Sequence, residues 1–214
     1  MIRSARLLVL QTTRVGEKSI VLHTLSPEWG RRSFIVSAGK AMALYLPLNL
    51  LDAEVVENPK SDLWRIRAVS AVYPLAGLRG SVAKNAIGLF MSEVLFRLVR
   101  EECCEPGLFE WCEKSVLTLD ALQADYSNFH LRWLLELAGA LGFSPTAEDL
   151  APFAGDCYPA LCRMLRLDFA GCMLLPLSGS ERSRIAAVLL DYIFYHSDCR
   201  PEIRSLPVLH DLFA

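Results

Sequence analysis

The chain has 214 residues, of which 53% are hydrophobic and 21% are charged. This balance is typical of a packed globular protein with one long domain or two short ones, and it excludes a disordered chain. No run approaches the roughly 18 apolar residues of a membrane-spanning helix. The apolar run in residues 1–14 is too short for a secretory signal.

The net charge of −2 conceals an uneven distribution. Residues 1–70 hold ten basic and six acidic side chains, a net charge of +4, so the remaining residues carry −6. A basic segment favours a polyanionic partner. A solvated surface that happens to be basic would have the same composition, so both interpretations stay open.

The first 70 residues show the pattern of short strands separated by turns. Apolar and β-branched runs alternate with turn compositions such as Pro27–Gly30 and Asn58–Asp62. The predicted strands are Arg6–Thr13, Lys18–Leu25, Arg32–Ser37, Leu48–Glu57 and Leu63–Ser70. Five strands so closely spaced favour a small barrel, with the OB-fold as the first choice and an SH3-like barrel as the alternative.

Helices are expected after a break at Pro74, Gly77 and Gly80. Ser81 is a suitable N-cap for a long helix, because apolar residues follow at helical spacing from Ile87 to Val99. Further helices are predicted over Pro106–Leu122, Ser127–Gly142 and, capped by Ser180, Glu181–His196. Four prolines predict that Phe143–Gly179 is irregular, with one short helix near Pro159–Leu167, and an apolar tail, Ser205–Leu209, follows the last helix.

The resulting prediction is an α+β protein with two domains. Residues 1–72 would form a five-stranded OB-fold barrel that binds nucleic acid, and residues 73–214 would form an all-helical domain.

The seven cysteines do not predict a metal site. A structural zinc site needs two close pairs of ligands, usually two residues apart, whereas this chain offers Cys103-Cys104 and the pair Cys157 and Cys162. An odd cysteine count without a secretory signal favours a reduced cytosolic protein that uses cysteine as a small core residue. We therefore expect no metal and no other cofactor.

Catalytic motifs are also missing from the sequence. It contains no Gly-x-Ser-x-Gly elbow, no phosphate loop and no dinucleotide fingerprint. Isolated histidines such as His23 are best interpreted as hydrogen-bonded packing residues, and paired carboxylates such as Glu101-Glu102 as solvated charge. No catalytic residue is predicted, although carboxylates or cysteines that converge in a cleft would revive a hydrolase hypothesis.

The barrel segment does hold the residue types that single-stranded nucleic acid requires. Phosphates need a positive groove, and bases need flat side chains on which to stack. Trp64 lies opposite the arginines of its strand and is predicted to be core, as is Phe34, whereas Trp29 beside a turn glycine is the aromatic expected to be exposed. The predicted DNA contacts are Arg14, Lys18, Arg31, Arg32, Lys40, Arg65, Arg67 and Trp29.

The order of these motifs resembles the RecO family of DNA repair proteins, in particular its Bacteroidetes branch. The opening is similar in its first strand, in the Gly16-Glu17 turn, and in Thr24 followed by Glu28-Trp29-Gly30-Arg31. The segments Tyr73–Leu75, Lys84–Glu102, Asn128–His130, Leu141–Phe143 and Ser205–Leu209 are also similar. The likeness covers nearly the whole chain in the same order.

This resemblance implies an N-terminal OB-fold, a helical C-terminal domain and no catalytic residues. It also implies that the helical domain, residues 73–214, is the surface that binds protein partners. It implies that the chain binds single- and double-stranded DNA, anneals complementary strands, and works with RecR and with the acidic tail of single-strand-binding protein. It further implies that the chain helps RecA to replace single-strand-binding protein on gapped DNA.

Two departures from the family pattern have consequences. Many members carry a four-cysteine zinc module, and the Cys157–Cys172 region lacks its paired spacing. Members usually have a basic loop after the third strand, and here the segment Lys40–Leu46 carries a single charge. The second departure motivates an alternative, a protein-interaction adaptor whose barrel binds little DNA.

Overall fold

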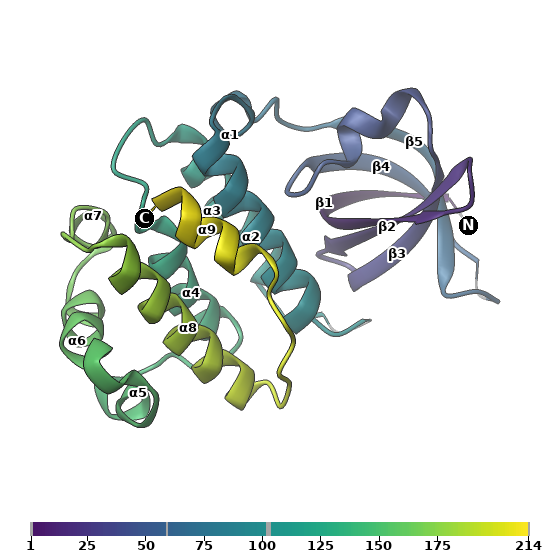
Figure 1. Ribbon diagram of the computed structural model, residues 1–214. Helices are drawn as coiled ribbons and strands as arrows, with labels where there is room; N and C mark the ends of the chain where they lie inside the picture. The colour runs from purple at the N-terminus through teal and green to yellow at the C-terminus, as the bar shows by residue number, and fades with distance from the viewer. Residues whose placement is uncertain (1, 59, 102–103, 214) are drawn as a thin grey trace. The chain divides into compact units, whose positions relative to one another are not determined.

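The computed structural model describes residues 2–58, 60–101 and 104–213, and for Lys40 it describes the backbone alone. Within these residues five strands are followed by helices, which confirms the predicted α+β class (Figure 1). The strands are β1 (Ile2–Val15), β2 (Ser19–Ser26), β3 (Gly30–Ser37), β4 (Leu50–Val56) and β5 (Leu63–Ala71).

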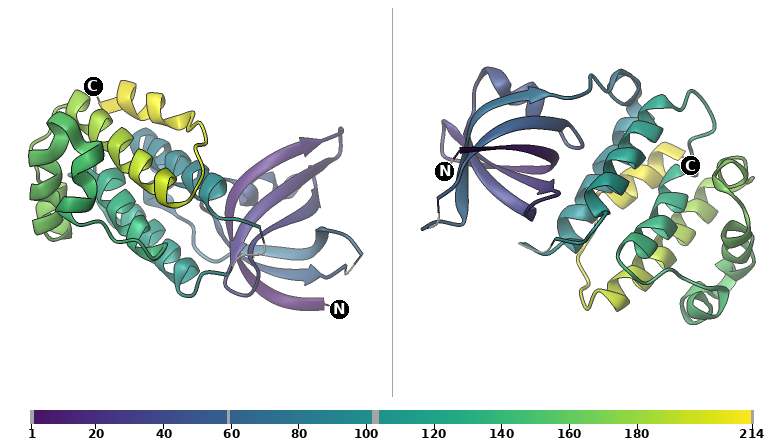
Figure 2. Two further views of the ribbon diagram at one scale, coloured as in Figure 1. Left: turned by 90° about the horizontal axis from the view of Figure 1, so that it is seen from below. Right: turned by 180° about the vertical axis from the view of Figure 1, so that it is seen from behind.

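The strands close into a barrel in the order β1-β2-β3-β5-β4, with β4 paired to β1 (Figures 1 and 2). This is the strand order of the OB-fold, the first choice from the sequence. The β3–β5 pair is parallel, whereas the other neighbours are antiparallel. Alternate residues of each strand face inward, so Leu7, Leu22 and Phe34 lie in the core with no exposed surface.

The apolar segment after β3 forms a short 3-10 helix, η1 (Lys40–Tyr45), which packs on the barrel core. Tyr45 is buried within the core, and Ala41 and Leu44 pack against it. Met42 and Leu46 remain exposed. Most of this segment is therefore apolar because it covers the barrel interior.

The chain divides into two compact units. The first, called the barrel unit here, contains the residues up to Ala76 together with Ser92–Leu117. The second, called the helical unit, contains Gly77–Met91 and the residues from Thr118 onward. The predicted boundary between residues 72 and 73 remains a prediction about which segments fold independently.

The helices have the bounds α1 (Ala76–Gly80), α2 (Val82–Leu98), α3 (Leu108–Ala121), α4 (Phe129–Ala140), α5 (Ala147–Ala154), α6 (Tyr158–Arg166), α7 (Phe169–Met173), α8 (Gly179–His196) and α9 (Ser205–Phe213). Helices α2, α3 and α4 begin and end near the predicted positions, whereas the short α1 forms where the sequence predicts a break at Gly77 and Gly80. The Ser81 hydroxyl accepts the backbone N–H of Lys84 at 3.3 Å, which confirms Ser81 as the cap of α2. Gly142, with φ +92°, follows α4 as the C-terminal glycine that the sequence predicts.

The prediction for Phe143–Gly179 was wrong, because α5 and α7 form there in addition to the expected α6. The prolines permit this: Pro159 lies in the first turn of α6, where a missing N–H costs little, and Pro152 interrupts only one bond of the short α5. Thr146 and Asp149 form a capping box that starts α5. Residues 205–209, interpreted as an apolar tail, belong to α9.

The predicted cap of the last long helix was also wrong. Ser178, not Ser180, begins α8, because Glu181 lies three residues after Ser178 and completes a capping box with it. The Ser178 hydroxyl accepts the Glu181 N–H at 3.2 Å, and the Glu181 carboxylate accepts the Ser178 N–H at 2.8 Å.

Buried polar side chains hold the helical unit together. The Lys84 ammonium group is buried and donates to the backbone carbonyls of Asp120 and Leu122 at the end of α3. The buried Asn128 amide donates to the carbonyls of Cys172 (3.0 Å) and Leu175 (2.8 Å). These bonds satisfy carbonyls that helix ends and loops would otherwise leave unpaired.

A close approach at Gly77 yields a prediction about stability. The Leu78 N–H donates to the Asp120 carboxylate at 2.7 Å, and a Cβ at Gly77 would collide with the Asp120 carbonyl. Gly77→Ala should therefore lower the free energy of unfolding by about 1–3 kcal/mol in urea titrations. Gly80→Ala, which meets no atom within 4 Å, should change it by less than about 0.5 kcal/mol. Equal stability of the two variants would contradict this prediction.

Candidate nucleic-acid interface

A cavity of about 470 Å³ opens on the barrel where β3 and β5 diverge. The parallel ladder begins at Ser33 and Leu63, so the residues just before them extend beyond the pairing. The cavity is lined by Val21, His23, Arg31, Arg32, Ser33, Asp62, Leu63 and Glu101. All of these residues belong to the barrel unit.

Arg31 is held firmly within this cavity. Its Nη1 donates to the backbone carbonyl of Phe96 at 2.8 Å, and the guanidinium carbon lies 4.9 Å from the centre of the Phe96 ring. Its Nη2 lies 3.4 Å from a carboxylate oxygen of Glu101. Burial lowers the pKa of Arg31, and the Glu101 charge opposes that shift. Glu101 is thus an ion-pair partner and not the purely solvated charge that the sequence predicts.

Arg32 stacks on an aromatic pair. Its guanidinium carbon lies 3.7 Å from the centre of the Trp64 ring, and Trp29 meets Trp64 edge-on at 5.2 Å. Trp64 and Phe34 are buried in the core, as predicted. Trp29 packs against that core and is half-buried, so it is less exposed than its place beside a turn glycine suggested.

A chain of hydrogen bonds runs across the outer face of β2 and β3. The Ser33 hydroxyl lies 3.5 Å from the Glu101 carboxylate, to which it donates its single proton. Ser33 must then accept from His23 Nδ1, 2.8 Å away, and His23 Nε2 accepts from the Thr13 hydroxyl at 3.1 Å. Burial is the main cause of a lowered His23 pKa, with Arg31 adding to it, so the ring is neutral. The prediction of a hydrogen-bonded packing histidine is confirmed at His23.

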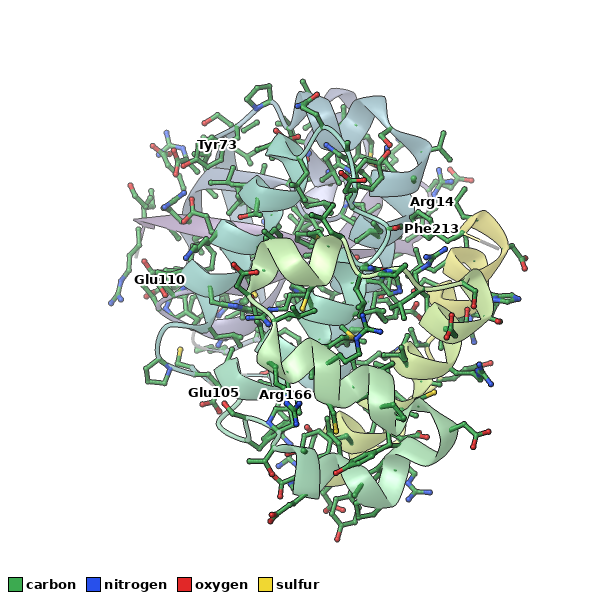
Figure 3. All side chains as sticks on the ribbon, turned by 90° about the vertical axis from the view of Figure 1, so that its left-hand side faces the viewer. Arg14, Tyr73, Glu105, Glu110, Arg166 and Phe213 are labelled. Carbon is green, nitrogen blue, oxygen red and sulfur yellow. The ribbon has the colours of Figure 1, made fainter. Side chains whose placement is uncertain are left out.

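The remaining predicted contacts lie at two places outside the cavity. Arg65 and Arg67 are exposed on β5, and Arg65 is the next outward-facing residue after Leu63, opposite Ile35 of β3. Arg67 lies where the β4–β5 ladder is irregular. Arg14 (labelled in Figure 3) and Lys18 are exposed at the β1–β2 hairpin. The Lys40 side chain lies outside the described part of the chain.

The structure therefore gathers Arg31 and Arg32 in the cavity with Arg65 beside it, while Arg14 and Lys18 do not line it. Sequence reasoning missed Ser33, Asp62 and Glu101 as cavity residues. The sequence pattern could have indicated Ser33, because it follows Arg31 by two residues in the strand and so lies on the same outer face of β3. Glu101 had none, because it is 70 residues away from Arg31 in the sequence.

The described cysteines lie in mixed environments. Cys112, Cys157 and Cys172 are buried, as the core interpretation predicts, whereas Cys104 is exposed. Among residues 2–58, 60–101 and 104–213, no three His, Cys, Asp or Glu side chains are grouped so that they could hold a metal ion. In the same part of the chain, no helix has the length and apolar character needed to cross a membrane.

Comparison with known proteins agrees with this architecture. Residues 79–152 match the family model described as Recombination protein O C terminal. The DNA repair protein RecO of Phocaeicola vulgatus is 28% identical over 234 aligned positions, which cover 97% of each chain. RecO of Bacteroides fragilis is 27% identical over 236 positions, covering 96% of this chain and 97% of the relative. Over nearly its whole length the chain is therefore similar to proteins of the RecO family.

The relatives are DNA repair proteins, and the chain that resembles them has an OB-type barrel. The family model matches a segment from α1 to α5, whereas the alignments to the relatives also include the barrel. Apart from Glu101, the residues that line the cavity therefore lie in the part of the chain that the alignments to these relatives include and the family model does not.

The contacts of Arg31 predict that it stabilises the barrel unit. Arg31→Ala removes the bond to the Phe96 carbonyl and the pair with Glu101, so the free energy of unfolding should fall by about 1.5–3 kcal/mol. Arg65→Ala, at an exposed position, should change it by less than about 0.5 kcal/mol. Chemical denaturation measures the free energy of unfolding of both variants. An Arg31→Ala variant as stable as the parent would refute the prediction that Arg31 stabilises the barrel unit.

Proposed function

We propose that this chain is a non-enzymatic recombination mediator of the RecO family, whose barrel binds single- and double-stranded DNA without sequence preference. The observation that carries the proposal is the presence of Arg31 and Arg32 in a cavity on an OB-type barrel, with Arg65 exposed outside the cavity on the adjoining strand β5. OB-folds bind single strands through a positive groove and stacking side chains.

Within this proposal the exposed cations contact the phosphates directly. Arg65 and Arg67 on β5 and Arg14 and Lys18 at the hairpin are exposed, and we assign Lys40 the same role. Arg31 and Arg32 contribute positive charge from within the cavity. A DNA base stacks only on the part of the Trp29 ring that is exposed to solvent. Annealing follows because partial neutralisation lets two complementary strands lie close together.

The helical unit is assigned to protein partners. We propose that it binds RecR and the acidic tail of single-strand-binding protein, so that RecA can be loaded onto covered DNA in the cytoplasm, at the nucleoid. Large apolar side chains that stay exposed on this unit, such as Val82, Leu174 and Tyr195, are suited to protein contacts.

A second candidate is an adaptor whose barrel binds little DNA. Two observations favour it: Asp62 and Glu101 place negative charge in the cavity, and η1 carries no basic residue after Lys40. The adaptor would bind the same protein partners and leave an oligonucleotide free.

Charge reversal on β5 tests the DNA interface without disturbing the buried arginines. The double variant Arg65→Glu, Arg67→Glu should bind a fluorescent single-stranded oligonucleotide about tenfold more weakly or worse, because two phosphate contacts become repulsive. Fluorescence anisotropy at 50 mM salt measures the affinity. The control Arg163→Glu, Arg166→Glu makes the same charge change on exposed positions of α6. Equal losses in both variants would show that net charge alone is responsible.

A salt series separates the mediator from the adaptor. If the barrel neutralises Z phosphates, the logarithm of the binding constant should fall by about 0.7Z for each tenfold rise in salt. Anisotropy between 50 and 300 mM salt, with and without the acidic tail peptide, measures this slope. Tail binding with no oligonucleotide binding at micromolar protein would favour the adaptor, and oligonucleotide binding independent of salt would exclude an electrostatic interface.

A further inference from the structure

Glu101 and Cys104, which follow α2 in the sequence, contact β3 and the turn that precedes it. Glu101 forms a parallel β-bridge with Arg31 through the backbone. Further along, the Cys104 thiol lies 3.7 Å from the carbonyl of Pro27, in the turn between β2 and β3. The Glu101 side chain thereby enters the cavity that carries the proposed DNA contacts.

Inside the cavity the Glu101 carboxylate has the partners that a phosphate oxygen would select. One carboxylate oxygen lies 3.4 Å from Arg31 Nη2 and 3.5 Å from the Ser33 hydroxyl. A guanidinium and a hydroxyl are donors for carboxylate and phosphate alike. His23 positions the Ser33 oxygen by donating to it from Nδ1.

The Glu101 contact is easily exchanged, whereas its partners are fixed. The Glu101 side chain is 55% exposed, and an ion pair so accessible to water is weak. Arg31 is 18% exposed and is held independently by the Phe96 carbonyl and ring. The carboxylate can therefore leave while the donors stay in place.

We propose that Arg31 and Ser33 form a phosphate-binding subsite for the DNA backbone, which the Glu101 carboxylate occupies as an intramolecular competitor until a DNA phosphate displaces it. The proposal rests on the proposed function, since the subsite lies in the cavity assigned to DNA. A tethered carboxylate acts at an effective concentration in the millimolar range, so a single free phosphate competes poorly. A strand that also contacts Arg65 and Arg67 has the additional attachment needed to displace it.

Neutralising Glu101 tests the competition. Glu101→Gln should bind a single-stranded oligonucleotide about two- to fivefold more tightly than the parent, the range that corresponds to one exposed ion pair. Glu101→Asp, which keeps the charge but shortens the side chain, should also bind more tightly. The control Glu110→Gln makes the same charge change on the exposed face of α3 in the same unit (Figure 3). A gain of equal size in Glu110→Gln would overturn the proposal.

A double-mutant cycle tests whether the gain passes through Arg31. Arg31→Lys keeps the charge but not the forked donors, so it should weaken DNA binding more in the Glu101→Gln background than in the parent. Equal losses in the two backgrounds would overturn the subsite. If the parent and Glu101→Gln bind DNA with equal affinity, the competitor is refuted and the proposed function stands; if neither binds DNA, both proposals fall.

Discussion

The short parallel pairing of β3 with β5 is the constraint on which the rest of the barrel unit depends. It joins three residue pairs, Ser33 with Leu63, Phe34 with Trp64 and Ile35 with Arg65, and it closes the barrel. Because side chains alternate along each strand, closure buries Phe34 and Trp64 and turns Ser33, Leu63 and Arg65 outward. The β3–β5 ladder begins at Ser33 and Leu63, and the cavity opens at this end of the ladder. Barrel closure and the candidate interface are therefore two results of one pairing.

The charge of the barrel is smaller than the first 70 residues suggest. Residues 1–76 carry +4, but Ser92–Leu117 carries −3 and joins the same unit, which leaves +1. Three of the basic side chains are already paired, Arg3 with Glu57, Arg6 with Glu113 and Arg31 with Glu101. Positive charge is concentrated on the exposed residues of β5 and the β1–β2 hairpin. In the proposed interface these exposed side chains are therefore the ones that contact the DNA phosphates.

Patterns among residues close together in the sequence predicted most of the fold but only part of the candidate site. The strand positions, the Ser81 cap and the Gly142 stop depend on neighbours in the sequence, and they were predicted correctly. Helices α5 and α7 were missed because the prolines of residues 143–179 were taken to indicate irregular structure, whereas α6 was predicted. The α8 cap was misplaced because Ser178 and Ser180 look equivalent until Glu181 selects Ser178. In the site, the arginines of β3 were visible as charge. Their role as packed side chains depends on Phe96 and Glu101, which only the folded chain brings to them.

The helices α2 and α3 each contribute residues to both compact units. The barrel unit is thus discontinuous in the sequence, and its last element is complete only when Leu117 has been synthesised. At a translation rate of about 5–20 residues per second, the segment between Ala76 and Leu117 takes roughly 2–8 s to produce. For about the first 1–4 s of that time Arg31 lacks both the Phe96 carbonyl and the Glu101 carboxylate, because Phe96 follows Ala76 by 20 residues. The ribosome therefore releases the positively charged Arg31 before it releases Phe96 and Glu101, which bind its guanidinium in the folded chain.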